Sequence, residues 1–240
     1  MPLYVPEDCK TLKEAVARVA QDPRITTIVL GQGEHVVEVL TDERGHANNI
    51  LYISSAMRIV GRPDVPKEKI VVVGGIKFTK GIQGNCHLQH MTLRQLKGNG
   101  VRGLSSFTME DVLVEQCGLI GVVAECAGVV GRCTNVEVRQ CGWSGVVASI
   151  GASITLIGAK TTVHHNCTQG RGHHYGLNAS FSSLSTIQLV SPLTKEQVAV
   201  DNGGGGNWGA NGGVLHQIKT IEAPAIVSSS AHVGETKSIH

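Results

Sequence analysis

The chain of 240 residues has few aromatic side chains, almost no net charge and no long apolar run. Aromatic residues make up 3% of it, and 21 basic residues nearly balance 19 acidic ones, for a formal net charge of +2. Nucleic-acid-binding surfaces usually carry a basic stripe with interleaved aromatic rings. No stretch approaches the roughly 20 apolar residues of a membrane-spanning helix. The composition therefore predicts neither a nucleic-acid partner nor a membrane partner.

The N-terminus and the cysteines point to one kind of compartment. The first ten residues, MPLYVPEDCK, lack the charged and then apolar segments of a secretory signal. The seven cysteines are odd in number, and none lies in a CxxC pair. Free thiols in a reducing environment fit this pattern best, with cysteine acting as a small apolar side chain. We therefore expect an intracellular protein.

Glycine is abundant, at 30 of 240 residues, and hydrophobic residues make up 41% of the chain. A core of small aliphatic side chains with frequent glycine turns is typical of many short strands. The one clear helix pattern is TLKEAVARVAQD at 11–22, where Thr11 and Glu14 form a capping box and Pro23 ends the apolar stripe. From residue 25 onward, apolar and polar residues alternate as they do in strands.

Two stretches of the chain nearly duplicate each other. VLVEQCGLIGV at 112–122 returns as VEVRQCGWSGV at 136–146, with each shared residue 24 positions later. A coil of roughly 24 residues with about three short strands, each stacked in parallel on its counterpart, explains such a repeat. The last inward apolar residue before the turn then falls at Leu93, Val114, Val138, Val163 and Val200. The helix at 11–22 would cover the first open end of this stack.

The stretches TLKEAVARVA, ITTIVLGQGEHVVEVL and LYISSAMRIVGRP resemble the opening of right-handed parallel β-helix proteins of the pectin-lyase-like superfamily. The VEVRQCGWSGVVAS units are similar to repeats shared by carbohydrate-binding and sugar-hydrolase β-helices. The resemblance covers roughly residues 8–220. It implies an all-β fold, a single-stranded right-handed parallel β-helix of about eight coils with an N-terminal capping α-helix. The same scaffold carries lyases, hydrolases, epimerases, adhesins and non-catalytic recognition domains, so it leaves the function open.

We expect one domain with three segments. Residues 1–24 form the capping segment with the helix at 11–22, residues 25–221 form the parallel β-helix, and residues 222–240 form a C-terminal tail. The surface or an open end of the β-helix could pair with a second copy of the chain, so a homo-oligomer is compatible with this fold.

Two neighbouring coils appear enlarged at one corner. The distance from the aligned apolar residue to the next strand is 8 residues in three coils and 14 in the next two. The added residues fall in the loops 164–176 and 201–213, and this alignment places Arg171 opposite Trp208 and His164 opposite Asp201. Binding residues concentrate on loops held by a rigid scaffold.

These two loops contain the residues that we expect to bind a ligand. A tryptophan among glycines can stack on a sugar ring, and an arginine can pair with a carboxylate. The alternative is that both loops are unstructured surface insertions. The expected ligand-binding residues are Arg171, His173, His174, Tyr175, Asn202 and Trp208.

The same corner offers weaker candidates for a metal site. His164, His173 and His174 are suitable ligand types, and His165 and Cys167 lie between them. No standard ligand spacing is matched, and adjacent strand residues point to opposite faces, so His164 and His165 could both bind only if the strand has already ended. We therefore expect no cofactor, with calcium or zinc as the alternatives.

Catalytic chemistry is poorly supported by the sequence. Hydrolytic β-helices use grouped aspartates because a general acid and a base must flank one bond, and the chain has neither an Asp-Asp pair nor an Asn-Thr-Asp run. A lyase site could still be built with a histidine or tyrosine as the base. The catalytic candidates are Arg139, His164, Tyr175 and Asp201.

Two further stacks are expected along the repeat. The residue just after each aligned apolar position should point outward, and these residues alternate in charge, which favours an ion-pair ladder over a binding strip. They are Arg94, Glu115, Arg139, His164 and Asp201. Cys117 and Cys141, with Leu96 in the same position one coil earlier, should form an inward stack that serves packing rather than reactivity.

These observations lead to two hypotheses of different classes. The first is a non-catalytic recognition or structural β-helix that presents the loops 164–176 and 201–213 to a polysaccharide or protein partner. The alternative is a small polysaccharide-active enzyme, pectate-lyase-like or glycoside-hydrolase-like, that acts at the same corner.

Overall fold

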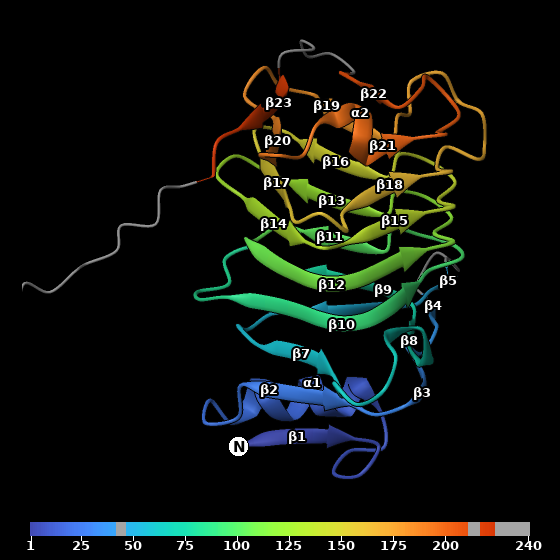
Figure 1. Ribbon diagram of the computed structural model, residues 1–240. Helices are drawn as coiled ribbons and strands as arrows, with labels where there is room; N and C mark the ends of the chain where they lie inside the picture. The colour runs from blue at the N-terminus through green and yellow to red at the C-terminus, as the bar shows by residue number, and fades with distance from the viewer. Residues whose placement is uncertain (42–46, 211–216, 224–240) are drawn as a thin grey trace, which may run out of the picture.

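The computed structural model describes residues 1–41, 47–210 and 217–223. It is an all-β, β-helix-like structure in which short parallel strands stack above one another along one axis (Figure 1). The stack has three faces, and every strand pair within them is parallel. No helix in this described part of the chain is long and apolar enough to cross a membrane.

The first two faces belong to one 14-stranded sheet, and the third face is a 7-stranded sheet. Two long strands, β10 (Cys86–Arg94) and β12 (Phe107–Glu115), run through both of the first two faces and bend between them at His90 and Asp111. The first face also contains β1 (Pro2–Val5), β2 (Thr27–Leu30), β7 (Arg58–Gly61), β14 (Val130–Thr134), β17 (Ser153–Ile157), β20 (Thr186–Val190) and β23 (Ile218–Ile221). The second also contains β3 (Gly33–Val36), β8 (Ile70–Val73), β15 (Glu137–Arg139), β18 (Thr162–His164) and β21 (Ala199–Val200).

The third face consists of β6 (Ile50–Ile53), β9 (Gly75–Phe78), β11 (Val101–Gly103), β13 (Val122–Glu125), β16 (Val146–Ser149), β19 (Leu177–Ser180) and β22 (Trp208–Gly209). A separate antiparallel pair joins β4 (Leu40–Thr41) to β5 (Ala47–Asn48). The short helices η1 (Lys67–Lys69) and α2 (Lys195–Val198) were not expected from the sequence. Their local signals extend over too few residues to stand out as helical periodicity.

The predicted helix is α1 (Leu12–Gln21), with Thr11 and Asp22 as its caps. The Thr11 hydroxyl accepts a hydrogen bond from the Glu14 amide at 3.1 Å. The apolar stripe of α1 is buried at the β1 end of the stack (Figure 1), where it covers the interior as predicted. Strand β1, which was not expected, precedes the helix and pairs with β2 as the outermost strand of the first face.

The repeat read from the sequence is confirmed over four coils. Leu93 pairs with Val114, Val114 with Val138, and Val138 with Val163, and all four side chains are fully buried. The fifth alignment is wrong by one residue, because Val163 pairs with Ala199 rather than Val200. The helix α2, closed by a capping box at its N-terminus, ends at Val198 and takes that residue out of the strand.

Candidate functional site

The second enlarged loop is shorter than the sequence alignment implied. Val163 to Leu177 spans 14 residues as predicted, but the next coil needs only 9 residues from Ala199 to Trp208. Trp208 therefore pairs with Leu177 and does not lie opposite Arg171 as predicted. His164 likewise pairs with Val200 and not with Asp201. Residues 211–213 of the predicted loop 201–213 lie outside the described residues.

In this register Trp208 has a role in packing and not in ligand binding. Its partner Leu177 points into the core and is fully buried, and Trp208 packs against the core at the far end of the stack. The Lys195 ammonium of α2 lies 5.2 Å from the centre of the Trp208 ring. The ring is thus held between the core and a cation, an arrangement that stabilises the end of the stack.

The tryptophan that the structure places beside loop 164–176 is Trp143. Its ring stacks on His174, with centroids 4.8 Å apart and an interplanar angle of 16°. The Arg171 guanidinium lies 5.5 Å from the Trp143 ring centre, and the indole N–H donates to Gln169 at 2.8 Å. Sequence reasoning missed Trp143, although it is the aromatic residue that replaces Leu119 in the duplicated stretch.

His174 is the buried member of the histidine-rich loop, and 8% of it is exposed. Burial, together with the nearby His173 and Arg171, lowers the pKa of His174 to about 4. The imidazole is therefore neutral at physiological pH. Among the described residues its Nε2 atom has no hydrogen-bond partner. Exposed His173 lies 4.3 Å away, ring centre to ring centre.

Tyr175 packs on the glycine run of the next coil instead of lining a cleft with Arg139. A Cβ atom at Gly205 or Gly209 would lie 2.4 Å from the Tyr175 ring, which no real side chain tolerates. The Gly205 amide also donates to the His174 carbonyl at 2.8 Å. Glycine in this run lets the backbone pass directly against loop 164–176, so the run supports that loop. These contacts argue against the alternative that loop 164–176 is an unstructured insertion.

A groove of about 420 Å³ lies on the third face beside Trp143. The buried, outward-facing Val123 and Val147, paired with each other in β13 and β16, line it. Phe181, which is 70% exposed, also lines the groove. The Arg102 and Glu125 side chains form an ion pair of 2.6 Å there, so charged hydrogen-bonding groups accompany the apolar surface.

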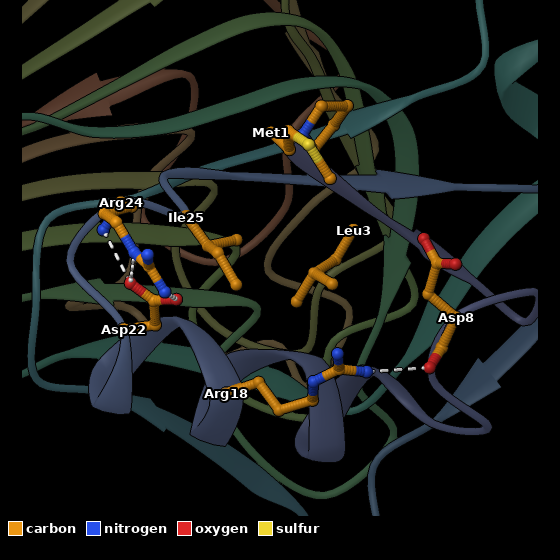
Figure 2. Close-up of a pocket in the computed structure, with 8 residues that line it drawn as sticks. Met1, Leu3, Asp8, Arg18, Asp22, Arg24 and Ile25 are labelled. Carbon is orange, nitrogen blue, oxygen red and sulfur yellow. Dashed lines mark hydrogen bonds and ion pairs between the residues drawn. The ribbon is translucent and has the colours of Figure 1, made fainter.

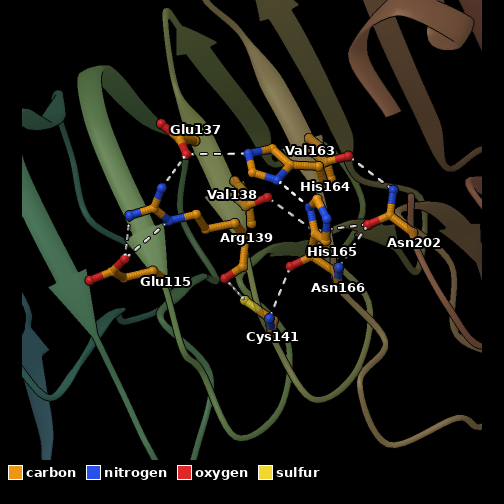
Figure 3. A network of polar contacts seen from close by, with 10 residues as sticks. All are labelled: Glu115, Glu137, Val138, Arg139, Cys141, Val163, His164, His165, Asn166 and Asn202. Carbon is orange, nitrogen blue, oxygen red and sulfur yellow. Dashed lines mark hydrogen bonds and ion pairs between the residues drawn. The ribbon is translucent and has the colours of Figure 1, made fainter. Parts of the chain in front are cut away.

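The predicted ladder of alternating charges exists on the second face from Arg94 to His164, and Figure 3 shows its part from Glu115 to His164. Arg94 and Arg139 pair with opposite oxygens of Glu115, at 2.6 and 2.8 Å. Burial would raise the pKa of the Glu115 carboxyl, but these arginine hydrogen bonds outweigh it and hold the pKa below its ordinary value. Arg139 also pairs with Glu137 at 2.9 Å, and His164 Nε2 lies 3.2 Å from the same carboxylate. Val200 occupies the position predicted for Asp201.

The inward stack at the adjoining corner is only partly as predicted. Cys117 and Cys141 are buried, and their thiols donate to the carbonyls of Glu115 and Arg139 at 3.7 and 3.5 Å, but Leu96 is 67% exposed and Gln95 is buried in its place. The backbone accounts for this error, because Gln116 and Gln140 adopt a left-handed conformation just before the cysteines and Gln95 does not. Next to the cysteines come Asn166 and Asn202, whose side chains share a 3.0 Å hydrogen bond.

The Asn202 side chain therefore bonds to the backbone of this corner, where it has a structural role and does not face a ligand. Its amide nitrogen donates to the carbonyls of Val163 and Val200, at 2.9 and 3.0 Å. The preceding residue, Asp201, is exposed and lines a shallow depression of about 550 Å³ together with His165 and Thr168. Within the described residues no three His, Cys, Asp or Glu side chains are grouped to hold a metal ion.

A third cavity, of about 420 Å³, lies at the α1 end of the molecule (Figure 2). Met1, Leu3 and Ile25 provide its apolar surface. Its charged groups are used locally, because Arg18 donates to the Asp8 carbonyl at 2.8 Å and Arg24 pairs with Asp22 at 2.8 Å. None of the residues that line this cavity is aromatic, whereas Trp143 and Phe181 line the groove on the third face.

Comparison with protein-family models, with curated proteins and with solved structures found no match for this chain. The site must therefore be interpreted from its own geometry.

Proposed function

We propose that the protein is a non-catalytic recognition module that binds a polysaccharide in the groove beside Trp143. In this proposal the groove is carried by a right-handed parallel β-helix of about eight coils, of the pectin-lyase-like kind. Loop 164–176 supplies Arg171 and His174, which contact the Trp143 ring and hold it at the groove, and the glycine run 203–206 supports this loop. The free thiols of all seven cysteines support an intracellular location.

One observation carries the proposal, the combination of aromatic and charged groups around one groove. Sugar rings present apolar C–H faces to aromatic side chains and hydroxyl groups to charged and amide side chains. Trp143 and Phe181 supply the first kind of surface, and Arg102 and Glu125 supply the second. The stack on His174 fixes the Trp143 ring before any ligand arrives, which lowers the entropic cost of binding.

The arrangement of carboxylates argues for binding over hydrolysis. Glycosidases need two carboxyl groups that flank one bond. Glu115 and Glu137 are both engaged by Arg139, and Glu125 is engaged by Arg102. A carboxylate held by a guanidinium is a poor proton donor at neutral pH.

The second candidate function is a small polysaccharide lyase or hydrolase at the same corner. The hydrogen-bonded chain from Glu137 through His164 to His165 favours it, because a carboxylate behind a histidine orients that histidine as a base. Under this alternative His164 and Arg139 act together in the reaction. Tyr175, which packs on Gly205 and Gly209, takes no part in it.

The two functions can be separated with the purified full-length chain. The recognition function predicts retention on a glycan array without any product. The enzyme predicts ultraviolet absorbance from an unsaturated sugar when uronate polymers are offered, and its loss in His164→Ala. Absence of binding to every immobilised glycan, with no product either, would contradict both and leave a protein partner or a structural role.

A further inference from the structure

The side chains of His164 and His165 converge, although they are neighbours in the sequence. Adjacent residues in a strand point to opposite faces, but β18 ends at His164 and His165 adopts a left-handed backbone with φ of 54°. The two Nδ1 atoms are therefore 2.8 Å apart, with the rings nearly perpendicular at 85° (Figure 3). The backbone turn removes the obstacle that the sequence pattern raised against their joint use.

Glu137 determines which nitrogen of His164 is available. A carboxylate only accepts hydrogen bonds, so the Nε2 atom of His164, 3.2 Å from Glu137, carries the proton. The Nδ1 atom of the neutral ring then presents its electron pair to His165 and accepts the 2.8 Å hydrogen bond from the His165 Nδ1–H group. If His165 moves its ring proton to Nε2, both Nδ1 atoms present electron pairs to the same point.

The spacing of the two nitrogens suits a particular coordination geometry. Two ligands about 2.0 Å from a metal ion and at right angles to each other lie about 2.8 Å apart, whereas tetrahedral ligands lie about 3.3 Å apart. The observed separation is 2.8 Å. Right-angled nitrogen ligands are typical of square-planar or tetragonal Cu(II) and Ni(II).

Residues behind the two histidines already orient the His164 ring. Metal-binding histidines usually donate their other ring N–H to a carboxylate, which orients the ring and raises its basicity. Glu137 has this role toward His164, and the Arg139 guanidinium holds Glu137 at 2.9 Å. Arg139 is itself anchored on buried Glu115. The ring of His164 is thus fixed from behind by a three-residue ion-pair network.

The point of convergence is open to solvent. His165 is exposed and lines the 550 Å³ depression, and Asp201 takes the same left-handed corner position in the next coil and lines it too. A metal ion on the two histidines would therefore retain coordination positions for water or for an oxygen donor from a ligand.

We propose that His164 and His165 form a two-histidine chelating site for a divalent transition-metal ion with right-angled coordination, Cu(II) or Ni(II), with Glu137 orienting His164. The site is independent of the groove beside Trp143 and does not require glycan binding.

The test is titration of the full-length chain, freed of metal by chelator treatment, with CuCl2 or NiCl2 in a calorimeter. His165→Asn removes one ligand while asparagine tolerates the left-handed backbone, and His164→Gln removes the other. We expect each to weaken the tightest site at least 100-fold. Glu137→Gln, which keeps an acceptor but loses its charge, should weaken it about 10- to 100-fold.

His173→Ala is the matched control, because His173 and His174 are the other adjacent histidines of the loop and His174 is buried. This variant should bind as the parent chain does. Electron paramagnetic resonance of the Cu(II) complex should show two imidazole nitrogens, reduced to one in His165→Asn. Equal affinity of the parent chain and His165→Asn, with both folded by circular dichroism, would overturn the proposal. So would a spectrum without imidazole coordination.

Discussion

The indole of Trp143 lies parallel to the imidazole of His174, and these two rings come from turns 31 positions apart in the sequence. The contact joins the duplicated repeat to the enlarged loop, and it places an aromatic wall on the groove of the third face.

Replacing Trp143 by alanine should weaken glycan retention about 10-fold or more, because one aromatic wall of the groove is lost. Trp208→Ala is the matched comparison. It should leave retention nearly unchanged and lower the free energy of unfolding by about 2 to 4 kcal/mol, since Trp208 packs on the core. Glycan-array binding and chemical denaturation measure the two effects. Retention lost in Trp208→Ala but kept in Trp143→Ala would contradict the placement of the site.

The neutral, buried His174 should make stability fall in acid. Its folded pKa, about 4, lies below the ordinary value of 6.5, so the unfolded chain binds more protons between these values. Stability is therefore intact above about pH 6.5 and declines as the pH falls toward 4, by an amount on the order of 2 to 3 kcal/mol. Denaturation at several pH values should show this slope in the parent chain and in His173→Ala. It should be absent in His174→Phe, and an unchanged slope there would contradict the assignment.

Glu115 should contribute more to stability than exposed carboxylates do. Glu115→Gln leaves Arg94 and Arg139 without their shared carboxylate, and we expect it to lower the free energy of unfolding by about 2 kcal/mol. Glu38→Gln is the control. It breaks a pair whose side chains are 49% and 63% exposed, so its cost should be much smaller than that of Glu115→Gln. Equal costs in urea denaturation would show that the ladder contributes little.

Stability should also depend on pH through Glu115. Since the folded pKa of its carboxyl is held below the ordinary 4.5, its contribution is present above that value and is lost as the pH falls through the folded pKa. This acid-dependent loss should be missing in Glu115→Gln.

Gly209 should be intolerant of a side chain because of Tyr175. The three nearest atoms to an added Cβ are all in the Tyr175 ring, at 2.4 to 2.6 Å. We expect Gly209→Ala to cost about 1 to 3 kcal/mol of stability. The double variant with Tyr175→Ala should recover much of this loss, which a double-mutant cycle would measure as coupling. Gly172→Ala, where nothing lies within 4 Å, should be nearly neutral.

The cysteines should resist thiol reagents while the chain is folded. Burial raises the pKa of Cys133 to about 12, and the neighbouring Cys117 side chain, together with burial, raises the pKa of Cys141 well above the usual value. Little thiolate exists at neutral pH, and reagents cannot reach it. Only Cys126 is partly exposed, so it should react first with a thiol-specific chromogenic reagent. Rapid reaction of several thiols before unfolding would contradict this packing.

The repeat and its stacking could be predicted from the sequence. The register from Leu93 through Val163, the helix at 11–22 and the ladder from Arg94 to His164 depend on local alternation and on a repeat that needs no distant information. One coil stacked on the next forces equivalent residues together, so the spacing along the chain becomes proximity in space. This is why the loop 164–176 could also be located correctly.

The identity of the tryptophan at the site could not be predicted in this way. Beyond Val163 the spacing changes, and a four-residue helix at 195–198 shifts the next strand by one position. The loop that follows is also shorter than the alignment implied, so Trp208 pairs with Leu177 and packs against the core, and the packing of loop 164–176 brings His174 onto Trp143. Side-chain direction reverses with every residue of a strand, so a single-residue error exchanges inside for outside. Only the folded chain decides such a register. For the same reason, only the backbone turn at His165 could bring two neighbouring histidines to one point.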